Sequence, residues 1–246
     1  MELSLAIDQG NSSAKLSVFD GDAMLATERH EQLDESVLAS VMKRFCITRA
    51  IYSSVVGNDE AVLSLLRNST RRCYVVDENL PLPLSLGYST PHTLGHDRIA
   101  VAAAAMFLHS GSNVLVVDSG TAITYDVVTA DRCFVGGNIA PGITVRFEAL
   151  SHYCAQLPVI DAEGDVPLVG YDTATAIRSG VVLGVVAEVA YMANRLSEKY
   201  GNLSVLLTGG DSDLIAKRLD IPNKVEINHN LVTIGLNRIL QYNELL

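Results

Sequence analysis

Two short segments of the sequence decide the fold: Asp8-Gln9-Gly10-Asn11-Ser12 and Asp118-Ser119-Gly120-Thr121-Ala122. Both read Asp-x-Gly, followed by Asn or Thr and then by Ser or Ala. Each follows an apolar run and precedes a second strand-like run, so each predicts a hairpin with an acidic, glycine-containing turn. The two copies lie nearly half the chain apart, and a repeat of this length indicates two related domains rather than a solenoid.

Phosphate binding would explain the composition of these turns. Glycine lets the backbone approach a ligand closely, and the turn N–H groups and the hydroxyls of Ser12 and Thr121 can donate hydrogen bonds to phosphate oxygens. The Asp that begins each turn is suited to hold a cation that screens the phosphate charge. The alternative for either segment alone is a hairpin whose Asp and Gly serve only the turn. The matched pair favours phosphate binding.

Composition and charge exclude several classes of protein. The 246 residues are enough for one large domain or two modest ones. The net charge is −10 and no cluster of Lys and Arg overrides it, which argues against a nucleic-acid surface. The N-terminus lacks the basic region of a signal peptide, and Glu188 interrupts the apolar stretch Val181–Ala193. We therefore expect a soluble, cytoplasmic protein without membrane or nucleic-acid partners.

The cysteines and histidines suggest neither disulfides nor a metal site. The four Cys are widely spaced, no Cys-x-x-Cys occurs, and the six His form no metal-ligand spacing, so reduced thiols are expected. The sequence also contains neither Gly-x-x-x-x-Gly-Lys-Ser/Thr nor Gly-x-Gly-x-x-Gly. The two commonest nucleotide-binding loops are therefore absent.

Strand-like and helical segments alternate, which is typical of a mixed α/β protein with segregated hairpins. The predicted strands are Leu3–Ile7, Leu16–Phe19, Ala50–Val55, Cys73–Val76, Val114–Val117, Ala122–Val128, Cys133–Ile139 and Leu203–Thr208. The predicted helices are Glu35–Phe45, Asn58–Asn68, Arg98–His109, Thr144–Ser151, Asp172–Tyr200, Asp213–Leu219 and Leu231–Leu246. Residues 79–96 are rich in Pro and Gly and predict a loop at an active-site rim. The natural boundary at Ser110–Asn113 divides the chain into domains of residues 1–111 and 112–246.

A third group of polar residues, Gly95-His96-Asp97-Arg98, stands at the entrance to an alanine-rich helix. As a purely structural feature, Asp97 would cap the helix, whose dipole favours a carboxylate there, and Arg98 would be solvated. A chemical role fits equally well. Asp97 would accept the proton of a substrate hydroxyl during phosphoryl transfer, and Arg98 would bind a substrate carboxylate through two hydrogen bonds.

Together these motifs resemble the type III pantothenate kinases. Asp8-x-Gly-Asn-Ser with Lys15 resembles the first phosphate motif of that family, and Asp118-x-Gly-Thr-Ala resembles the second. Tyr88 and Gly95-x-Asp-Arg98 are similar to the family's substrate pocket. Further family motifs follow in the right order over essentially the whole chain, at Gly136–Gly142, Thr173–Gly180, Thr208–Asp211 and Leu231–Leu240.

The resemblance implies the fold of the acetate/sugar kinase–hexokinase–actin superfamily: α/β, with two ribonuclease-H-like domains and ATP in the cleft between them. It implies ATP-dependent phosphorylation of pantothenate to phosphopantothenate, the first step of coenzyme A biosynthesis. The cofactors implied are ATP, Mg²⁺ and either K⁺ or NH₄⁺. The implied assembly is a homodimer.

The resemblance also assigns roles to residues. The ATP phosphates would be bound by the first motif, which comprises Asp8, Gln9, Gly10, Asn11, Ser12, Ser13, Ala14 and Lys15. Within it, Lys15 would neutralise phosphate charge and Asp8 would help to place Mg²⁺. Asp97 would be the general base. The substrate contacts would be Tyr88, Gly95, His96, Asp97, Arg98 and Thr173. Thr121 would contact a phosphate oxygen, and Asp118 would bind the monovalent cation.

Two residues depart from the family pattern. Ser12 replaces the commoner Thr and keeps the hydroxyl, and Asp172 stands where Asn is usual, which adds charge beside Thr173. Two other functions remain open: another kinase of the superfamily that acts on a sugar or acetate, and a non-catalytic regulatory relative. The presence of Gly95-x-Asp-Arg98 beside Tyr88 argues against the first. The presence of Lys15 and Asp97 argues against the second.

Overall fold

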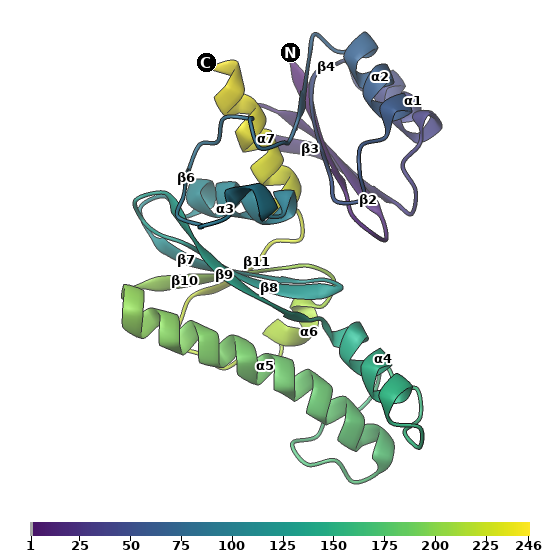
Figure 1. Cartoon of the computed structure of the whole chain (residues 1–246), viewed down its shortest axis with the longest axis vertical. Coiled ribbons are helices and arrows are strands. Elements are labelled where there is room, and N and C mark those ends of the chain that lie inside the picture. The colour runs from purple at the N-terminus through teal and green to yellow at the C-terminus, as the bar shows by residue number, and fades with distance from the viewer. Residues whose placement is uncertain (1) are drawn as a thin grey trace. The chain divides into compact units, whose positions relative to one another are not determined.

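The computed structural model describes residues 2–246, which form two compact units (Figure 1). The first unit holds the residues up to Leu108, residues 132–134 and residues 230–246, and the second holds residues 109–131 and 135–229.

The first unit is a five-stranded sheet covered by helices. Its strands are β1 (Leu3–Gln9), β2 (Ala14–Asp20), β3 (Ala23–His30), β4 (Ile47–Ser54) and β5 (Arg72–Val75). Its helices are α1 (Glu35–Arg44), α2 (Glu60–Ser69), α3 (His96–Leu108) and α7 (Leu231–Glu244), with a 3₁₀ turn at Pro91–Thr93. On β1, the side chains of Leu3, Leu5 and Ile7 join the core cluster that contains buried residues of α1 and α2. Ser4 lies between them in the strand, and its side chain instead contacts α7.

The second unit has its own sheet and one dominant helix. Its strands are β7 (Asn113–Ser119), β8 (Ala122–Val128), most of β9 (Cys133–Pro141), β10 (Leu203–Thr208) and β11 (Val225–Ile227). Its helices are α4 (Ile143–Tyr153), α5 (Thr173–Tyr200) and α6 (Ser212–Ala216). The short strand β6 (Ser85–Leu86) pairs with Cys133 and Phe134, the residues of β9 that are grouped with the first unit.

Corresponding strands occur in the same order in the two sheets. The first sheet runs β3-β2-β1-β4-β5, and the second contains β9-β8-β7-β10-β11. In each unit the hairpin with the Asp-x-Gly turn is antiparallel, and its first strand pairs in parallel with a later strand, β1 with β4 and β7 with β10. The repeat predicted from the two turns is therefore confirmed at the level of topology.

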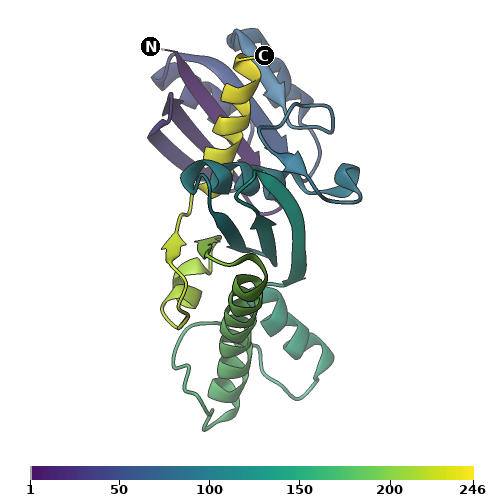
Figure 2. The ribbon, with the colours of Figure 1, turned by 90° about the vertical axis from the view of Figure 1, so that its left-hand side faces the viewer.

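The C-terminal helix α7 belongs to the first unit, although the predicted division into residues 1–111 and 112–246 places it in the second domain. It lies along the first sheet and against α3 (Figure 2). Asn237 of α7 accepts a hydrogen bond from the Ser4 hydroxyl at 2.7 Å and donates one to the Gly21 carbonyl at 2.9 Å. These contacts, between segments far apart in sequence, explain why a single cut in the chain does not separate the two units.

Close backbone packing fixes α7 to α3. A Cβ atom added at Gly235 would lie 1.7 Å from the carbonyl oxygen of Ala100. Only glycine allows this approach. The run Ile99–Ala105 of α3 is fully packed, with no residue more than 6% exposed. The packing fixes the helix whose first turn carries Asp97 and Arg98.

The elements expected from the sequence are present, and three strands were not predicted. These are β3, in which exposed and half-buried positions alternate at the sheet edge, the two-residue β6 and the three-residue β11. Helix α6 is shorter than expected and ends at Ala216. The loop predicted at residues 79–96 contains β6, the 3₁₀ turn and the first residue of α3.

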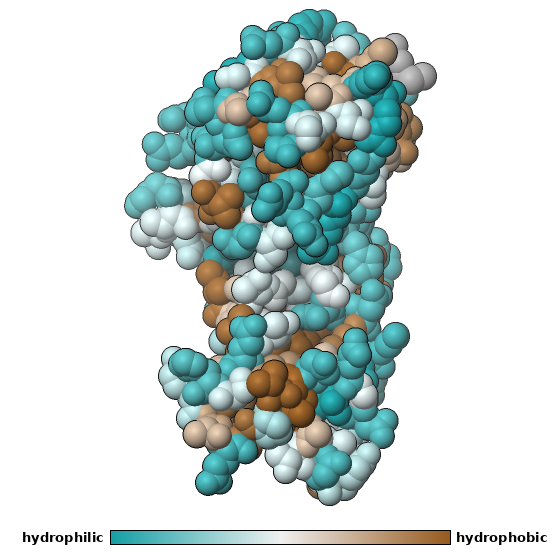
Figure 3. Space-filling model, turned by 90° about the vertical axis from the view of Figure 1, so that its right-hand side faces the viewer, coloured by the Kyte–Doolittle hydropathy of each residue, from teal (hydrophilic) through white to brown (hydrophobic). Residues whose placement is uncertain are grey.

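The long helix α5 is a core element of the second unit. By length and composition alone it would be able to cross a membrane. In the structure Val182, Val185 and Val189 pack in the unit's core, and Glu188 forms an ion pair with Arg146 of α4. Other apolar side chains of this unit are exposed, some of them on the side where α4 lies (Figure 3): Tyr153, Val159, Leu168, Val169, Tyr171 and Tyr191.

Candidate functional site

The first Asp-x-Gly turn joins β1 to β2. Gly10 donates its N–H to the Ser13 carbonyl at 2.9 Å, which closes the turn and leaves Asn11 and Ser12 exposed to solvent. Asp8 and Lys15 are opposite each other in the strand pairing. A cavity of about 290 Å³ adjoins the turn and is lined by Gln9, Gly10, Asn11, Ser13, Ala14, Glu31, Gln32, Leu33 and Val56. The predicted phosphate motif therefore borders a hollow in which a polar ligand would meet backbone and hydroxyl groups.

Gln9 is held by a residue that the sequence analysis did not identify. The hydroxyl of Tyr52, on β4, donates to Gln9 Oε1 at 2.5 Å, and the same hydroxyl accepts the N–H of Asp59 at 3.4 Å. Tyr52 is fully buried. In the sequence it is one more apolar residue in a buried strand, so no local signal marks it.

Asp8 carries the strongest electrostatic perturbation in the first unit that bears on function. Its carboxyl is mostly buried, and this burial, together with the negative charge of Asp97, raises its pKa to about 6, against the opposing effect of Lys15. Asp97 and Lys15 thus both act electrostatically on Asp8, in opposite directions. The structure brings together the predicted Mg²⁺ ligand, the predicted base and the predicted phosphate-binding cation.

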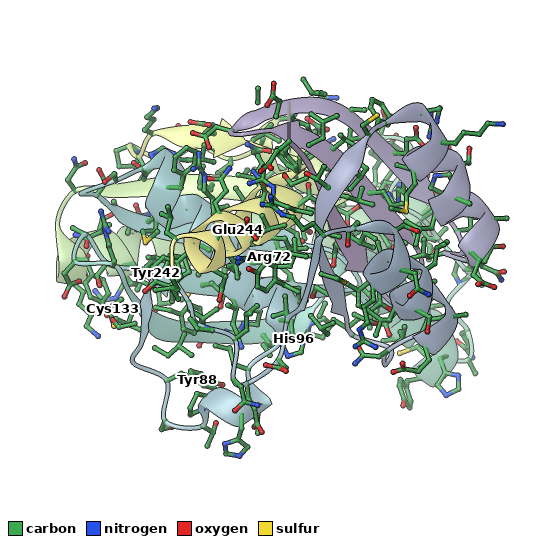
Figure 4. All side chains as sticks on the ribbon, turned by 90° about the horizontal axis from the view of Figure 1, so that it is seen from above. Arg72, Tyr88, His96, Cys133, Tyr242 and Glu244 are labelled. Atoms are coloured by element: carbon green, nitrogen blue, oxygen red, sulfur yellow. The ribbon has the colours of Figure 1, made fainter. Side chains whose placement is uncertain are left out.

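Asp97 lies in the first turn of α3. Its Oδ1 accepts the N–H of the next residue, Arg98, at 2.8 Å. The N-cap position belongs to Gly95, whose carbonyl accepts the Ile99 N–H, so Asp97 lies inside the first turn and is not the cap expected under the structural interpretation. A Cβ atom at Gly95 would lie 2.5 Å from the same oxygen. Glycine at this position therefore leaves space for the carboxylate. His96, the first residue of α3, and Tyr88 lie on the segment that leads from β6 into the helix (Figure 4).

Arg98 is buried, which contradicts the alternative in which it is solvated. The residue is only 6% exposed. Its guanidinium carbon lies 5.8 Å from the ring centroid of Tyr88 and 5.7 Å from that of Phe134, and the two rings are 6.1 Å apart. Aromatic rings at this distance attract a cation and restrict its orientation. Phe134 was not predicted, because in the sequence it is one more apolar residue of an ordinary strand, far from Arg98 along the chain.

The second Asp-x-Gly turn, between β7 and β8, lies in the second unit. Two glycines from distant motifs pack directly against it. A Cβ atom at Gly142 would lie 2.1 Å from the Gly120 carbonyl oxygen, and one at Gly209 would lie 2.4 Å from that of Ser119 and 2.6 Å from Asp118 Oδ1. Asp118 Oδ1 and a backbone carbonyl oxygen are thus close together, and oxygen donors of this kind suit a hard cation. Thr121 is exposed at the tip of the turn.

Thr173 is the first residue of α5, and its neighbour Asp172 is the N-cap. Asp172 Oδ1 accepts both the N–H and the hydroxyl of Thr175, each at 2.7 Å, and these hydrogen bonds hold the pKa of Asp172 below its usual value. Asn is an equally good N-cap. The departure from the family pattern therefore preserves the start of the helix.

The predicted site residues divide between the units. Asp8 to Lys15, Tyr88 and Gly95 to Arg98 lie in the first, whereas Asp118, Thr121 and Thr173 lie in the second. Within residues 2–246 there is no group of three or more His, Cys, Asp or Glu side chains that could hold a metal ion.

The raised pKa of Asp8 predicts that Asp8→Asn stabilises the fold at neutral pH. Below pH 3.8 the wild-type carboxyl is protonated whether the chain is folded or unfolded. As the pH rises from 3.8 towards about 6, the Asp8 carboxyl ionises in the unfolded chain but not yet in the folded one. This ionisation favours the unfolded chain, so the wild type loses stability that the uncharged variant keeps. At pH 7.5 the variant should be more stable by roughly 1–3 kcal/mol, and the difference should vanish near pH 4.

Urea unfolding at both pH values would measure this difference. Asp220→Asn, at an exposed position, is the control and should change stability by less than about 0.5 kcal/mol. An Asp8→Asn variant that is less stable than the wild type at pH 7.5 would refute the electrostatic picture of the turn.

Solved structures show the same fold. A putative Baf family transcriptional activator from Campylobacter jejuni has a TM-score of 0.61 at 24% identity and covers 98% of this chain and 100% of its own. A ROK hexokinase from Thermus thermophilus has a TM-score of 0.58 at 14% identity, covering 98% and 99%. A glucokinase from an Antarctic psychrotroph has a TM-score of 0.56 at 13% identity, covering 98% and 99%. The likeness to these structures confirms the predicted fold.

Sequence relatives are closer. The family model described as type III pantothenate kinase matches residues 4–195. The type III pantothenate kinase of Azobacteroides pseudotrichonymphae is 40% identical over 238 residues, which are 97% of this chain and 96% of that protein. That of Phocaeicola vulgatus is 38% identical over 242 residues, which are 98% and 99%. The turns, the buried Arg98 and these full-length matches agree, and the chain belongs to the type III pantothenate kinase family.

Proposed function

We propose that this chain is an ATP-dependent kinase that phosphorylates the primary hydroxyl of pantothenate, the first step of coenzyme A biosynthesis. One observation carries the proposal: Asp97, at the start of α3, acts electrostatically on Asp8 in the first phosphate turn. The proposed base for the substrate hydroxyl thus acts on the residue proposed to help place the metal ion, in the same unit. The buried Arg98, held beside the rings of Tyr88 and Phe134, supports a substrate side next to Asp97.

The residues have separate roles in this mechanism. Lys15 and the turn N–H groups bind and orient the ATP phosphates. Asp8 would help to hold a divalent metal ion, which would supply positive charge to neutralise the phosphates. Asp97 accepts the hydroxyl proton, and Arg98 holds the pantothenate carboxylate. Because transfer needs little covalent chemistry from the protein, positioning and charge account for most of the rate.

The second unit would contribute Thr121 to a phosphate oxygen, Thr173 to pantothenate and Asp118 to a monovalent cation. The oxygen of Asp118 and the nearby Ser119 carbonyl oxygen support the cation site, since both lie against the same glycine, Gly209.

We also infer a cytoplasmic homodimer. The exposed apolar side chains around α4 and α5 support an interface, and a light-scattering mass of 26.4 kDa rather than twice that value would contradict it.

A coupled assay of ADP release tests the proposed function. With ATP, Mg²⁺ and K⁺ present, pantothenate should be turned over, whereas glucose and acetate should give at most background rates. Preference for a sugar or for acetate would favour another kinase of the superfamily. The absence of turnover with every substrate, from a folded protein, would favour a regulatory relative such as the transcriptional activator named for the Campylobacter jejuni structure.

Asp97→Asn should abolish turnover and leave the fold intact. Asn keeps an oxygen that can accept the Arg98 N–H, so this contact in the first turn of α3 is preserved while the base is lost. Loss of a general base lowers the rate by about 10²–10⁴-fold. Turnover above about a tenth of the wild-type rate would reject the assignment as base. A variant whose main defect is a lower melting temperature would show that Asp97 only stabilises the first turn of α3.

Lys15 and Arg98 should affect different substrates. Lys15→Ala should raise the KM for ATP, and Arg98→Ala should mainly raise the KM for pantothenate, each by about 10–150-fold, the range for a lost hydrogen bond to a charged group. Pantothenyl alcohol, which lacks the carboxylate, is the matched probe. Its KM should hardly change in Arg98→Ala or in the milder Arg98→Lys. An equal loss for the acid and the alcohol would mean that Arg98 does not bind the carboxylate.

Asp118 should confer activation by potassium. A large, weakly hydrated ion suits a loose site of carboxylate and carbonyl oxygens, whereas Mg²⁺ demands tight octahedral geometry. We therefore expect strong activation by K⁺ or NH₄⁺, little by Na⁺ or Li⁺, and loss of this difference in Asp118→Ala even with excess Mg²⁺. Initial rates at matched ionic strength measure the effect, and equal wild-type rates in Na⁺ and K⁺ would overturn it.

A further inference from the structure

Arg146, in the first half of α4, uses its guanidinium to join three parts of the second unit. Its Nη1 and Nη2 atoms donate to the two carboxylate oxygens of Glu188 on α5, both at 2.7 Å. Its Nε donates to the carbonyl oxygen of Pro141, at the end of β9, at 2.8 Å. The bidentate geometry fixes the plane of the guanidinium group. The plane in turn fixes the direction from which Nε meets Pro141.

Glu188 is held from a second side. Tyr125, on β8, donates its hydroxyl hydrogen to Glu188 Oε2 at 3.2 Å. Tyr125 is 3% exposed, and its burial, together with the neighbouring Glu188 charge, raises its pKa, so the hydroxyl stays protonated as a donor. The hydrogen bonds from Arg146 keep the pKa of Glu188 low. The carboxylate is therefore ionised and anchored to both the sheet and α4.

The Pro141–Gly142 peptide bond, whose carbonyl oxygen Arg146 binds, packs directly against the second Asp-x-Gly turn. Gly142, which follows Pro141, donates its N–H to the Thr121 carbonyl oxygen at 2.9 Å. No side chain fits between Gly142 and the Gly120–Thr121 peptide, because a Cβ atom there would meet the Gly120 and Thr121 oxygens at 2.1 and 2.6 Å. The position of Pro141–Gly142 and the position of the turn are therefore coupled by direct backbone contact.

We propose that Arg146, oriented by Glu188 and Tyr125, is a positioning residue for nucleotide binding that holds the Gly120–Thr121 turn in place through Pro141–Gly142. The inference rests on the proposed function insofar as the turn binds the ATP phosphates. None of the three side chains needs to touch the nucleotide. Rigid support of this kind improves binding because less of the binding energy is spent on ordering the turn.

Arg146→Lys tests the proposal, because lysine keeps the charge and loses the forked geometry. The dissociation constant for ADP with Mg²⁺, measured by calorimetry on the intact protein at 25 °C, should rise about fivefold to tenfold, the size expected for one lost hydrogen bond. The KM for ATP should rise in parallel, while the KM for pantothenate should change less than about twofold. Arg195→Lys is the matched control, because Arg195 is an exposed residue of α5 that pairs with Glu198, and it should change none of these constants.

Two further variants keep the test decisive if Arg146→Lys is poorly folded. Glu188→Gln should weaken ADP binding in the same direction, and Tyr125→Phe should do so by a smaller factor. The double variant Arg146→Lys with Glu188→Gln should be little worse than Arg146→Lys alone, because the two residues act as a unit.

A purely structural role would give a different result. It would lower the melting temperature and leave the ADP dissociation constant of the folded protein within about twofold of the wild-type value, or it would weaken ATP and pantothenate equally. Either result would overturn the proposal. ADP binding is measured without turnover, so it also separates this inference from the proposed function. A wild type that binds ADP but does not phosphorylate pantothenate would refute the proposed function and leave the inference about Arg146 standing.

Discussion

The placement of two carboxylates in one small region of the first unit is the constraint on which the site depends. Asp8 is mostly buried at the end of β1, and the charge of Asp97 adds to the effect of burial, so that its pKa reaches about 6. Lys15, opposite Asp8 in the hairpin, offsets only part of this. A buried, partly unbalanced carboxylate is unfavourable for stability unless a cation compensates it. A metal–phosphate complex is a ligand that supplies this compensation, so the cost of the arrangement in the free protein is consistent with a binding function.

The framework that maintains this arrangement comes from segments far apart in the chain. Asp97 stands at the start of α3, and α3 is fixed by the close approach of Gly235 in α7 to Ala100. Helix α7 is in turn tied to β1 by the hydrogen bond between Ser4 and Asn237. The strand that carries Asp8 and the helix that begins at His96 are thus both fixed by one C-terminal helix. In the second unit, too, glycines allow segments distant in sequence to pack closely: Gly142 and Gly209 bring two motifs against the Asp118 turn.

Much of this was predictable from the sequence because its strongest signals are local. The hairpins follow from apolar runs on either side of an Asp-x-Gly turn, and their repetition predicts the shared strand order. What the sequence could not predict depends on packing at long range. Strand β3 lacks an apolar run because one of its faces is exposed at the sheet edge, and α7 joins the first unit through a glycine that resembles any other in the sequence. Tyr52 supports Gln9 through a hydrogen bond between two strands. Phe134 of β9 lies beside Arg98 of α3, and Arg98 is buried rather than solvated because it packs in this way against residues distant in sequence.

The most direct test of this account is a pH titration of the Asp8 side-chain carboxyl, followed by its carbon-13 chemical shift in the free protein and with ADP and Mg²⁺ bound. The account predicts a midpoint of about 6 in the free protein. It predicts a fall of at least about one unit when the metal–nucleotide complex binds, because a nearby cation favours the charged form. A midpoint that stays at about 6 with nucleotide and metal bound would show that the complex does not bind at the first turn, and would contradict the central claim.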